Sequence, residues 1–221
     1  MSSSQRLFSA LLLLLLFILA ASFGGPANGV EQSIMDAAAG LRSSMPGLVK
    51  ISAAVTILGG YPFTLGVAIS ATLILLARKQ WRPALLLLAT VLLERLVVEL
   101  LKDWIGRPRP LLAHLPNSLA FPSGHSANSM TTYLAVALFA LPAPYRRTAA
   151  ISAMILSVLV GITRIILGVH WPSDVIGGWT FGLMAVGLAH VAGEKSGTVT
   201  LKAKHEVVGG HLAPPGEDKS A

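Results

Sequence analysis

The sequence predicts an all-α protein, a polytopic membrane helical bundle with about six transmembrane helices. The mean hydropathy of +0.69 and the 53% share of hydrophobic residues exceed those of ordinary soluble domains. Six apolar stretches are long enough, or nearly so, to cross a bilayer that needs roughly 20 residues per helix. Because 221 residues suit one bundle, we expect a membrane domain over residues 1–192 and a disordered cytoplasmic tail over 193–221.

The first apolar stretch covers residues 7–23 and begins directly after Arg6. Its length favours an uncleaved membrane anchor. The alternative is a cleaved signal peptide, because small residues follow at Ala20, Ala21 and Ser22.

Residues 24–50 are more polar and are expected to form an interfacial segment on the outer side. Ile34, Ala38, Leu41 and Met45 recur at helical spacing, which predicts an amphipathic helix. This helix lies either in the plane of the membrane interface or on the bundle as part of a loop, and the sequence leaves both interpretations open.

Five further apolar stretches complete the bundle, at residues 55–77, 84–101, 126–141, 148–168 and 174–192. The residues 59–62, Gly-Gly-Tyr-Pro, predict a weak point near the start of the first of these helices. Pro83 suits the start of the next one. Gly178 and Gly182 form a small-xxx-small pair that lets helix backbones approach closely.

The stretch 84–101 carries three charged residues, Glu94, Arg95 and Glu99. Arg95 and Glu99 are four residues apart and therefore share a helix face. They form either a buried ion pair that fixes helix packing or a polar wall near the lipid headgroup.

Lysine and arginine in the short loops place both termini in the cytoplasm. On this assignment the cytoplasmic side carries Arg6, Arg78, Lys79, Arg82, Arg146, Arg147, Lys195, Lys202 and Lys204. Apart from the polar stretches described next, the opposite side carries only Arg42 and Lys50. Cleavage of the first stretch would leave the other five spans oriented the same way.

Three polar stretches fall at the outer ends of these spans, at residues 102–110, 122–125 and 164–174. Whole membrane crossings separate them in the chain, yet the topology brings them to one face. Charge in or beside a membrane segment is costly and therefore indicates function.

The basic residues of these stretches suit the binding of an anion. Arginine presents a planar fork of donors that matches phosphate oxygens, and lysine acts as a point charge. Ser123 and Gly124 directly precede a helix, whose free N–H groups and positive dipole end attract phosphate. Arg107 is explained equally well by contact with lipid headgroups. The residues expected to bind substrate are Lys102, Arg109, Ser123, Gly124 and Arg164.

Two histidines and an aspartate complete the predicted site. Asp174 follows His170 by four residues, with Pro172 suited to the first turn of the helix. A carboxylate bonded to one ring nitrogen leaves the other free to attack phosphorus. We therefore expect His170 to be the nucleophile, Asp174 to orient it and His125 to protonate the leaving oxygen.

The four remaining histidines lack such neighbours. His114 lies in an outer loop where it could touch substrate, and His190, His205 and His211 are expected to be structural or solvated. Paired metal-ligand spacing is absent from the sequence and acidic residues near the site are scarce, so we expect neither metal nor cofactor.

These motifs closely resemble those of the type 2 phosphatidic acid phosphatase superfamily of membrane lipid phosphatases. The family pattern is a lysine, six residues and Arg-Pro, then Pro-Ser-Gly-His, then Ser-Arg, five residues, His, three residues and Asp. The chain matches it from Lys102 to Pro110, over residues 122–125, and from Thr163 to Asp174, with Thr163 in place of serine. The resemblance implies a metal-free reaction in which His170 becomes a phosphohistidine.

Together, residues and resemblance predict a hydrolase that acts on a lipid phosphomonoester or diphosphate: phosphatidylglycerophosphate, phosphatidic acid or undecaprenyl diphosphate. The alternatives are a phosphotransferase or haloperoxidase with the same motif, or a non-catalytic lipid-binding or transport protein. We expect an integral protein of a bacterial inner or cell membrane whose active site faces the periplasmic or extracellular side. The expected partners are the bilayer and the lipid substrate, without nucleic acid.

Overall fold

The computed structural model describes residues 2–110, 118–196 and 198. Its helices are α1 (Ser3–Phe23), α2 (Gly29–Ser44), α3 (Pro46–Thr56), α4 (Tyr61–Ala77), α5 (Trp81–Ile105), α6 (Gly124–Ala135), α7 (Ala143–Ile166) and α8 (Pro172–Lys195). A 3₁₀ turn, η1 (Ile57–Gly59), joins α3 to α4, and a π-helical turn, η2 (Val136–Ala140), extends α6. No strand occurs within the described residues, so the predicted all-α class is confirmed.

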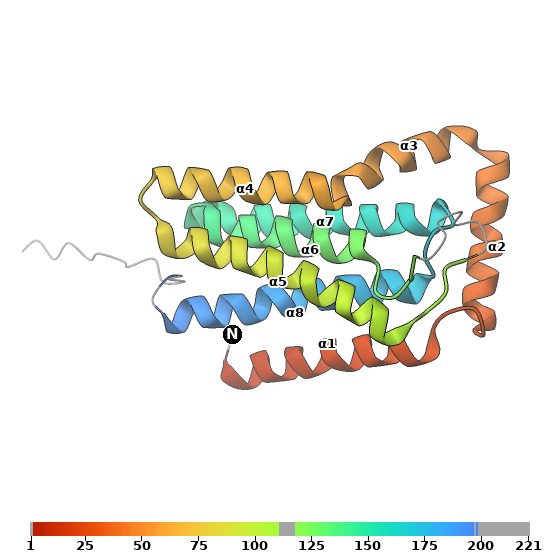
Figure 1. Cartoon of the computed structure of the whole chain (residues 1–221), viewed down its shortest axis with the longest axis horizontal. Coiled ribbons are helices and arrows are strands. Elements are labelled where there is room, and N and C mark those ends of the chain that lie inside the picture. The colour runs from red at the N-terminus through yellow and green to blue at the C-terminus, as the bar shows by residue number, and fades with distance from the viewer. Residues whose placement is uncertain (1, 111–117, 197, 199–221) are drawn as a thin grey trace, which may run out of the picture.

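The long helices run side by side along one axis, and α2 lies across one end of the bundle (Figure 1). Helix α6 is central, because it packs against α4, α5, α7 and α8. Ten of its twelve residues are buried, although its sequence is rich in serine and threonine. Helix α1 packs mainly against α8 and leaves a row of leucines exposed on its outer side.

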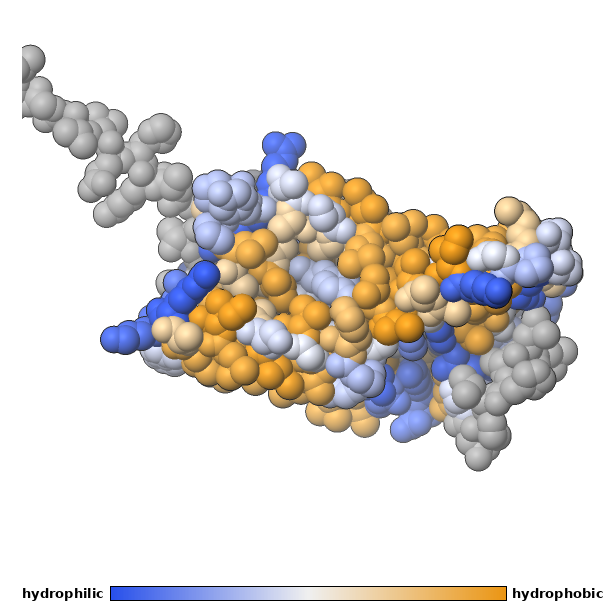
Figure 2. Space-filling view, turned by 90° about the horizontal axis from the view of Figure 1, so that it is seen from above, coloured by the Kyte–Doolittle hydropathy of each residue, from blue (hydrophilic) through white to orange (hydrophobic). Residues whose placement is uncertain are grey.

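The surface is that of a membrane protein. A hydrophobic band covers the middle of the molecule, and hydrophilic residues gather toward its two ends (Figure 2). Within the described residues, α1, α7 and α8 are each long and apolar enough to cross a bilayer. The bent pair of α3–η1 and α4 would make a fourth span, and the count of six stays a prediction.

The expected weak point at residues 59–62 is a real break. The axis bends by 43° between Pro46–Gly59 and Tyr61–Ala77. Gly60 caps α4 in extended conformation, and Pro62 lies in the first turn of that helix. The break places η1 against α6, at the end of the bundle where the polar stretches lie.

Helix α2 combines both interpretations of the segment 24–50. One side of it packs on α7 and α8, as a loop helix would, and buries Glu31, Met35 and Ala38. The other three residues of the predicted apolar stripe, Ile34, Leu41 and Met45, are exposed, as a helix lying in the interface would leave them. The buried face is rotated toward Glu31, a residue the sequence pattern did not single out.

Helix α8 continues to Lys195 and therefore extends three residues into the segment expected to be tail. Lys202 and Lys204 lie outside the described residues. The other basic residues expected on the cytoplasmic side cluster at the end of the bundle opposite to α2, near the start of α1 and the end of α8 (Figure 1).

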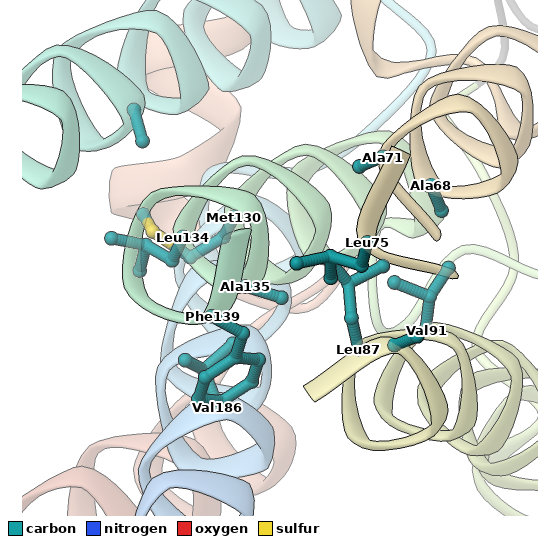
Figure 3. Close-up of a cluster of buried hydrophobic side chains, with 12 residues drawn as sticks. Ala68, Ala71, Leu75, Leu87, Val91, Met130, Leu134, Ala135, Phe139 and Val186 are labelled. Carbon is teal, nitrogen blue, oxygen red and sulfur yellow. The ribbon is translucent and has the colours of Figure 1, made fainter. Parts of the chain in front are cut away.

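The apolar core lies between α4, α5, α6 and α8. Leu75 of α4 meets Leu87 and Val91 of α5, while Leu134 and Phe139 continue the cluster toward α8 (Figure 3). Lipid tails are as apolar as these side chains, so close packing holds membrane helices together more than removal from water does. Small residues at the α6–α8 contact serve that purpose.

Gly178 is expected to tolerate no side chain. A Cβ placed there would lie 2.6 Å from the Ser123 carbonyl oxygen and 2.7 Å from Ser126 Cβ, so α8 would have to move away from α6. We expect Gly178→Ala to lower stability in detergent by about 1–3 kcal/mol and to lower activity, because Ser123 starts a helix at the predicted site. Gly187→Ala on the same helix is the matched control, since a Cβ there meets open space. Equal thermal stability of the two variants would contradict this packing argument.

Candidate active site

Four helix ends meet at the end of the bundle that α2 covers. Helices α5 and α7 end there, and α6 and α8 begin there (Figure 1). Lys102 lies in the last turn of α5 and Arg164 in the last turn of α7. His125 and Asp174 lie in the first turns of α6 and α8. The three polar stretches therefore occupy one end, as their spacing predicts.

His170 and Asp174 are the most deeply buried pair of this region. His170, in the turn between α7 and α8, is 1% exposed, and its Nδ1 lies 3.3 Å from Asp174 Oδ2. The same oxygen accepts a hydrogen bond from the Trp171 N–H at 2.8 Å. The other oxygen accepts from Arg107 Nη1 at 2.8 Å. The carboxylate is thus fixed by three partners and cannot rotate away from the imidazole.

The second ring nitrogen of His170 faces Arg109. His170 Nε2 lies 3.0 Å from Arg109 Nη1, which also donates to the Val169 carbonyl at 2.8 Å. Arg109 Nε donates to Ser118 Oγ at 2.6 Å. Because a guanidinium can only donate, Nε2 must offer its lone pair, and the ring proton must sit on Nδ1 toward Asp174.

His170 is held neutral. Burial, reinforced by the positive charge of Arg109, keeps the pKa of His170 well below its usual range. At neutral pH the ring therefore carries a free lone pair on Nε2, the form in which imidazole acts as a nucleophile.

Ser123 and Gly124 form the start of α6. The Ser123 N–H donates to the Asp174 carbonyl oxygen at 2.9 Å, which ties this loop to the first turn of α8. A Cβ placed on Gly124 would lie 3.4 Å from Arg95 Nη1 and 3.5 Å from Lys102 Nζ. Two cations thus lie beside the free N–H groups of a helix start, an arrangement suited to an anion.

Arg95 and Lys102 share one acidic partner. Each donates to Glu99 Oε1 at 2.8 Å, and the Glu99 side chain is 45% exposed. The interpretation of Arg95 and Glu99 as a buried ion pair is therefore wrong, and the polar wall fits better. Glu94 points into the bundle instead, and neither of its carboxylate oxygens has a hydrogen-bond partner within the described part of the chain.

His125 and Arg164 lie against the broken helix. A Cβ on Gly60 would lie 3.8 Å from His125 Nε2, so the break between η1 and α4 backs this imidazole. Arg164 Nη1 donates to Thr56 Oγ1 at 2.9 Å. Its Nε is buried without a partner among the described residues, which leaves a donor for a ligand.

The two imidazoles share one electrostatic environment. The charges of Lys102, Arg109 and Arg164 act on both His125 and His170. The excess of positive charge suits a dianionic phosphoryl group. Among the described residues, no group of three or more histidine, aspartate or glutamate side chains is placed to hold a metal ion.

Arg107 is buried in this region and bonded to the start of α8, which the sequence did not reveal. It is 6% exposed, so the explanation as a contact with lipid headgroups is wrong. Its Nη1 donates to Ser173 Oγ at 2.7 Å as well as to Asp174. Its Nη2 donates to the carbonyl oxygens of Ala20 and Ala21, both at 2.8 Å. Arg107 therefore joins the end of α1 to the start of α8.

His190 is separate from this cluster. His190 lies near the C-terminal end of α8 and stacks on Phe139. His114, His205 and His211 lie outside the described residues.

Comparison with known proteins gives consistent similarities. The model of the PAP2 superfamily matches residues 83–197, which include all three polar stretches. Phosphatidylglycerophosphatase B of Bacillus subtilis is 36% identical over 183 residues, 79% of this chain and 89% of that protein. Lipid A 1-phosphatase of Rhizobium etli is 39% identical over 108 residues, 43% of this chain and 44% of that protein. The crystal structure of a transmembrane PAP2 type phosphatidylglycerolphosphate phosphatase from Bacillus subtilis matches with a TM-score of 0.77 and 33% identity, covering 85% of this chain and 97% of that one.

Proposed function

The chain belongs to the PAP2 superfamily, and we propose that it hydrolyses phosphatidylglycerophosphate or a closely related lipid phosphate through a phosphohistidine intermediate. It is an integral membrane phosphatase, and the non-catalytic alternatives fall away because its relatives are phosphatases. The single observation that carries the mechanism is the orientation of His170, with Nδ1 turned to Asp174 and Nε2 beside Arg109.

In the first step the His170 Nε2 lone pair attacks phosphorus, and the bond from phosphorus to the lipid oxygen breaks. The leaving oxygen takes a proton from His125, so the lipid alcohol departs neutral. Burial and the nearby cations lower the pKa of His125, and the negative charge of the bound phosphoryl group offsets them and keeps the ring protonated for this step. Asp174 holds the Nδ1 proton and stabilises the positive charge that develops on the ring. The result is a phosphoryl group bonded to Nε2.

In the second step water attacks the phosphohistidine, and His125, now neutral, accepts a proton from that water. The bond between nitrogen and phosphorus breaks, phosphate leaves, and both imidazoles return to their initial state. The residues proposed to hold the phosphoryl oxygens throughout are Lys102, Arg109, Ser123, Gly124 and Arg164, the last through the Nε that has no partner in the described part of the chain.

The proposed substrate follows from similarity and from position. The relative that matches over 89% of its own length is a phosphatidylglycerophosphatase, which favours that headgroup over the alternatives. The site lies where helix ends meet the interface, so a lipid phosphate can reach it while its acyl chains stay in the bilayer. We propose that this end faces the periplasmic or extracellular side, with residues 1–192 as the catalytic domain and 193–221 as a cytoplasmic tail.

The test is phosphate release by purified protein in detergent. Phosphatidylglycerophosphate, phosphatidic acid and undecaprenyl diphosphate are supplied in the same mixed micelles, and kcat/KM is compared. We expect the highest value for phosphatidylglycerophosphate. A higher value for undecaprenyl diphosphate would reassign the substrate, and release from none of the three would contradict the proposed function.

A further inference from the structure

Glu31 is a buried acid on α2, the helix that lies across one end of the bundle. It occupies the first turn of α2 and is 6% exposed. Its Oε1 accepts from the Ser173 N–H at 2.5 Å, and its Oε2 accepts from Ser173 Oγ at 3.0 Å and from the Gly25 N–H at 2.5 Å. One carboxylate thus binds three donors, two of them on a residue 142 positions later in the chain.

Ser173 is the second residue of α8, so Glu31 caps that helix from outside. The first N–H groups of a helix lack partners within it, and a negative charge near them is stabilised by the helix dipole. Trp171, at the N-cap position of α8, has no side-chain acceptor that could do the same. Glu31 therefore accepts from the Ser173 N–H, while Asp174, within α8, accepts from the Trp171 N–H.

The contact continues to the reacting histidine. Ser173 Oγ, which donates to Glu31, accepts from Arg107 Nη1, and the same nitrogen donates to Asp174. Asp174 in turn holds His170. The resulting connected series of hydrogen bonds, here called the Glu31 network, contains Glu31, Ser173, Arg107, Asp174 and His170.

The link between α1 and α2 is shaped to make this contact. A Cβ placed on Gly24 would lie 1.8 Å from Ser173 Oγ, so the backbone packs directly on that hydroxyl. Gly25 has φ of +103°, a conformation that residues with a Cβ rarely adopt, and its N–H is the third donor to Glu31. The link is thus built around the carboxylate and the start of α8.

We propose that Glu31 is a positioning residue for the phosphatase reaction, which through Ser173 and Arg107 fixes the orientation of Asp174 and His170. The proposal rests on the proposed function. It implies that the active site becomes competent for catalysis only when α2 packs on the end of the bundle. A misplacement of reacting groups by about 1 Å can lower rates by about 100-fold, which sets the scale of the expected effect.

The test compares Glu31→Gln, Glu31→Asp and Ser173→Ala with wild type in the detergent assay. Glu31→Gln removes the negative charge and turns an amide N–H group toward hydrogen-bond donors, so we expect kcat to fall by roughly 10–100-fold. We expect KM to change by less than about threefold, because the residues that hold the phosphoryl group are untouched. Glu31→Asp keeps the charge and should recover part of kcat. Asp36→Asn, an exposed acid on the same helix, is the matched control and should retain wild-type kcat.

A double-mutant cycle separates positioning from general damage. If Glu31 acts through Ser173, the double variant Glu31→Gln with Ser173→Ala should lose little more kcat than the worse single variant. Fully additive losses, or wild-type kcat in Glu31→Gln, would overturn the proposal. Should Glu31→Gln fail to fold, Ser173→Ala decides alone, since it removes only the hydroxyl, and wild-type kcat there overturns the proposal too. A wild-type protein inactive on every lipid would instead count against the proposed function.

Discussion

Replacing His170 by alanine is expected to abolish turnover. No neighbour can take over the attack on phosphorus. The two side chains that contact the ring are Asp174 and Arg109, and they orient the nucleophile. We expect phosphate release to fall by at least about 10⁴-fold, since removing a nucleophile costs nearly as much as removing its whole catalytic unit. The measurement is initial rate in detergent, together with trapping of labelled phosphate on the protein during a single turnover.

The trapping experiment distinguishes the nucleophile from a merely necessary histidine. Wild-type protein should carry acid-labile phosphate after a short reaction, and His170→Ala should carry none. His125→Ala should still form the intermediate slowly with a good leaving group, because protonation is then less needed. His190→Gln, at the far end of α8, serves as the control and should behave as wild type. Full activity in His170→Ala would refute the nucleophile assignment.

The convergence of the three polar stretches was predictable from the sequence, for a simple reason. Helices that cross a membrane reverse direction each time, so the ends of every second crossing share a side. Lys102, His125 and Asp174 could therefore be placed together from the positions of apolar stretches alone. The pairing of His170 with Asp174 followed from their spacing and from the start of a helix at Pro172.

The Glu31 network could not be predicted in the same way. Glu31 lies in a polar segment with no local pattern, and its partner Ser173 is 142 residues away. The sequence also does not distinguish Arg107 from the other two cationic residues of its motif. Arg107 is buried, whereas Lys102 and Arg109 remain partly exposed. Such contacts depend on how α2 folds back over the bundle, which the apolar stripe of that helix does not indicate.

The same limit applies to Glu94 and Arg95, which are adjacent in sequence but face opposite environments. Arg95 lies over the Tyr61 ring at 4.8 Å and beside Gly124 at the start of α6, whereas Glu94 is buried between helices. Neighbouring residues on a helix are turned about 100° apart, and only the positions of the surrounding helices decide which of them is buried.

Asp174→Asn is expected to damage both catalysis and stability. An asparagine oxygen could still accept from one donor, but its amide group would either donate toward His170 Nδ1 or face Arg107, which cannot accept. Donation to Nδ1 would move the ring proton to Nε2 and block the attacking lone pair. By analogy with the aspartate of serine protease triads, we expect kcat to fall by about 10³–10⁴-fold.

The stability effect comes from Arg107. Its guanidinium is buried, and Asp174 is its only ion-pair partner among the described residues. Breaking a buried ion pair by removing one partner costs about 3–5 kcal/mol, because the other charge stays desolvated. Thermal unfolding in detergent should therefore show a large destabilisation in Asp174→Asn. Asp103→Asn, an exposed acid at the same end of the bundle, should show none.

A second variant tests whether the unpaired charge is the cause. Arg107→Gln in the Asp174→Asn background removes the buried cation, so the double variant should be more stable than the sum of the single losses predicts. Activity should not return, because the tautomer of His170 is still wrong. Recovery of stability without recovery of turnover would separate the two roles of Asp174, the counter-ion of Arg107 and the partner of the nucleophile. Additive stability losses would instead mean that the Arg107–Asp174 pair contributes little to holding α1 against α8.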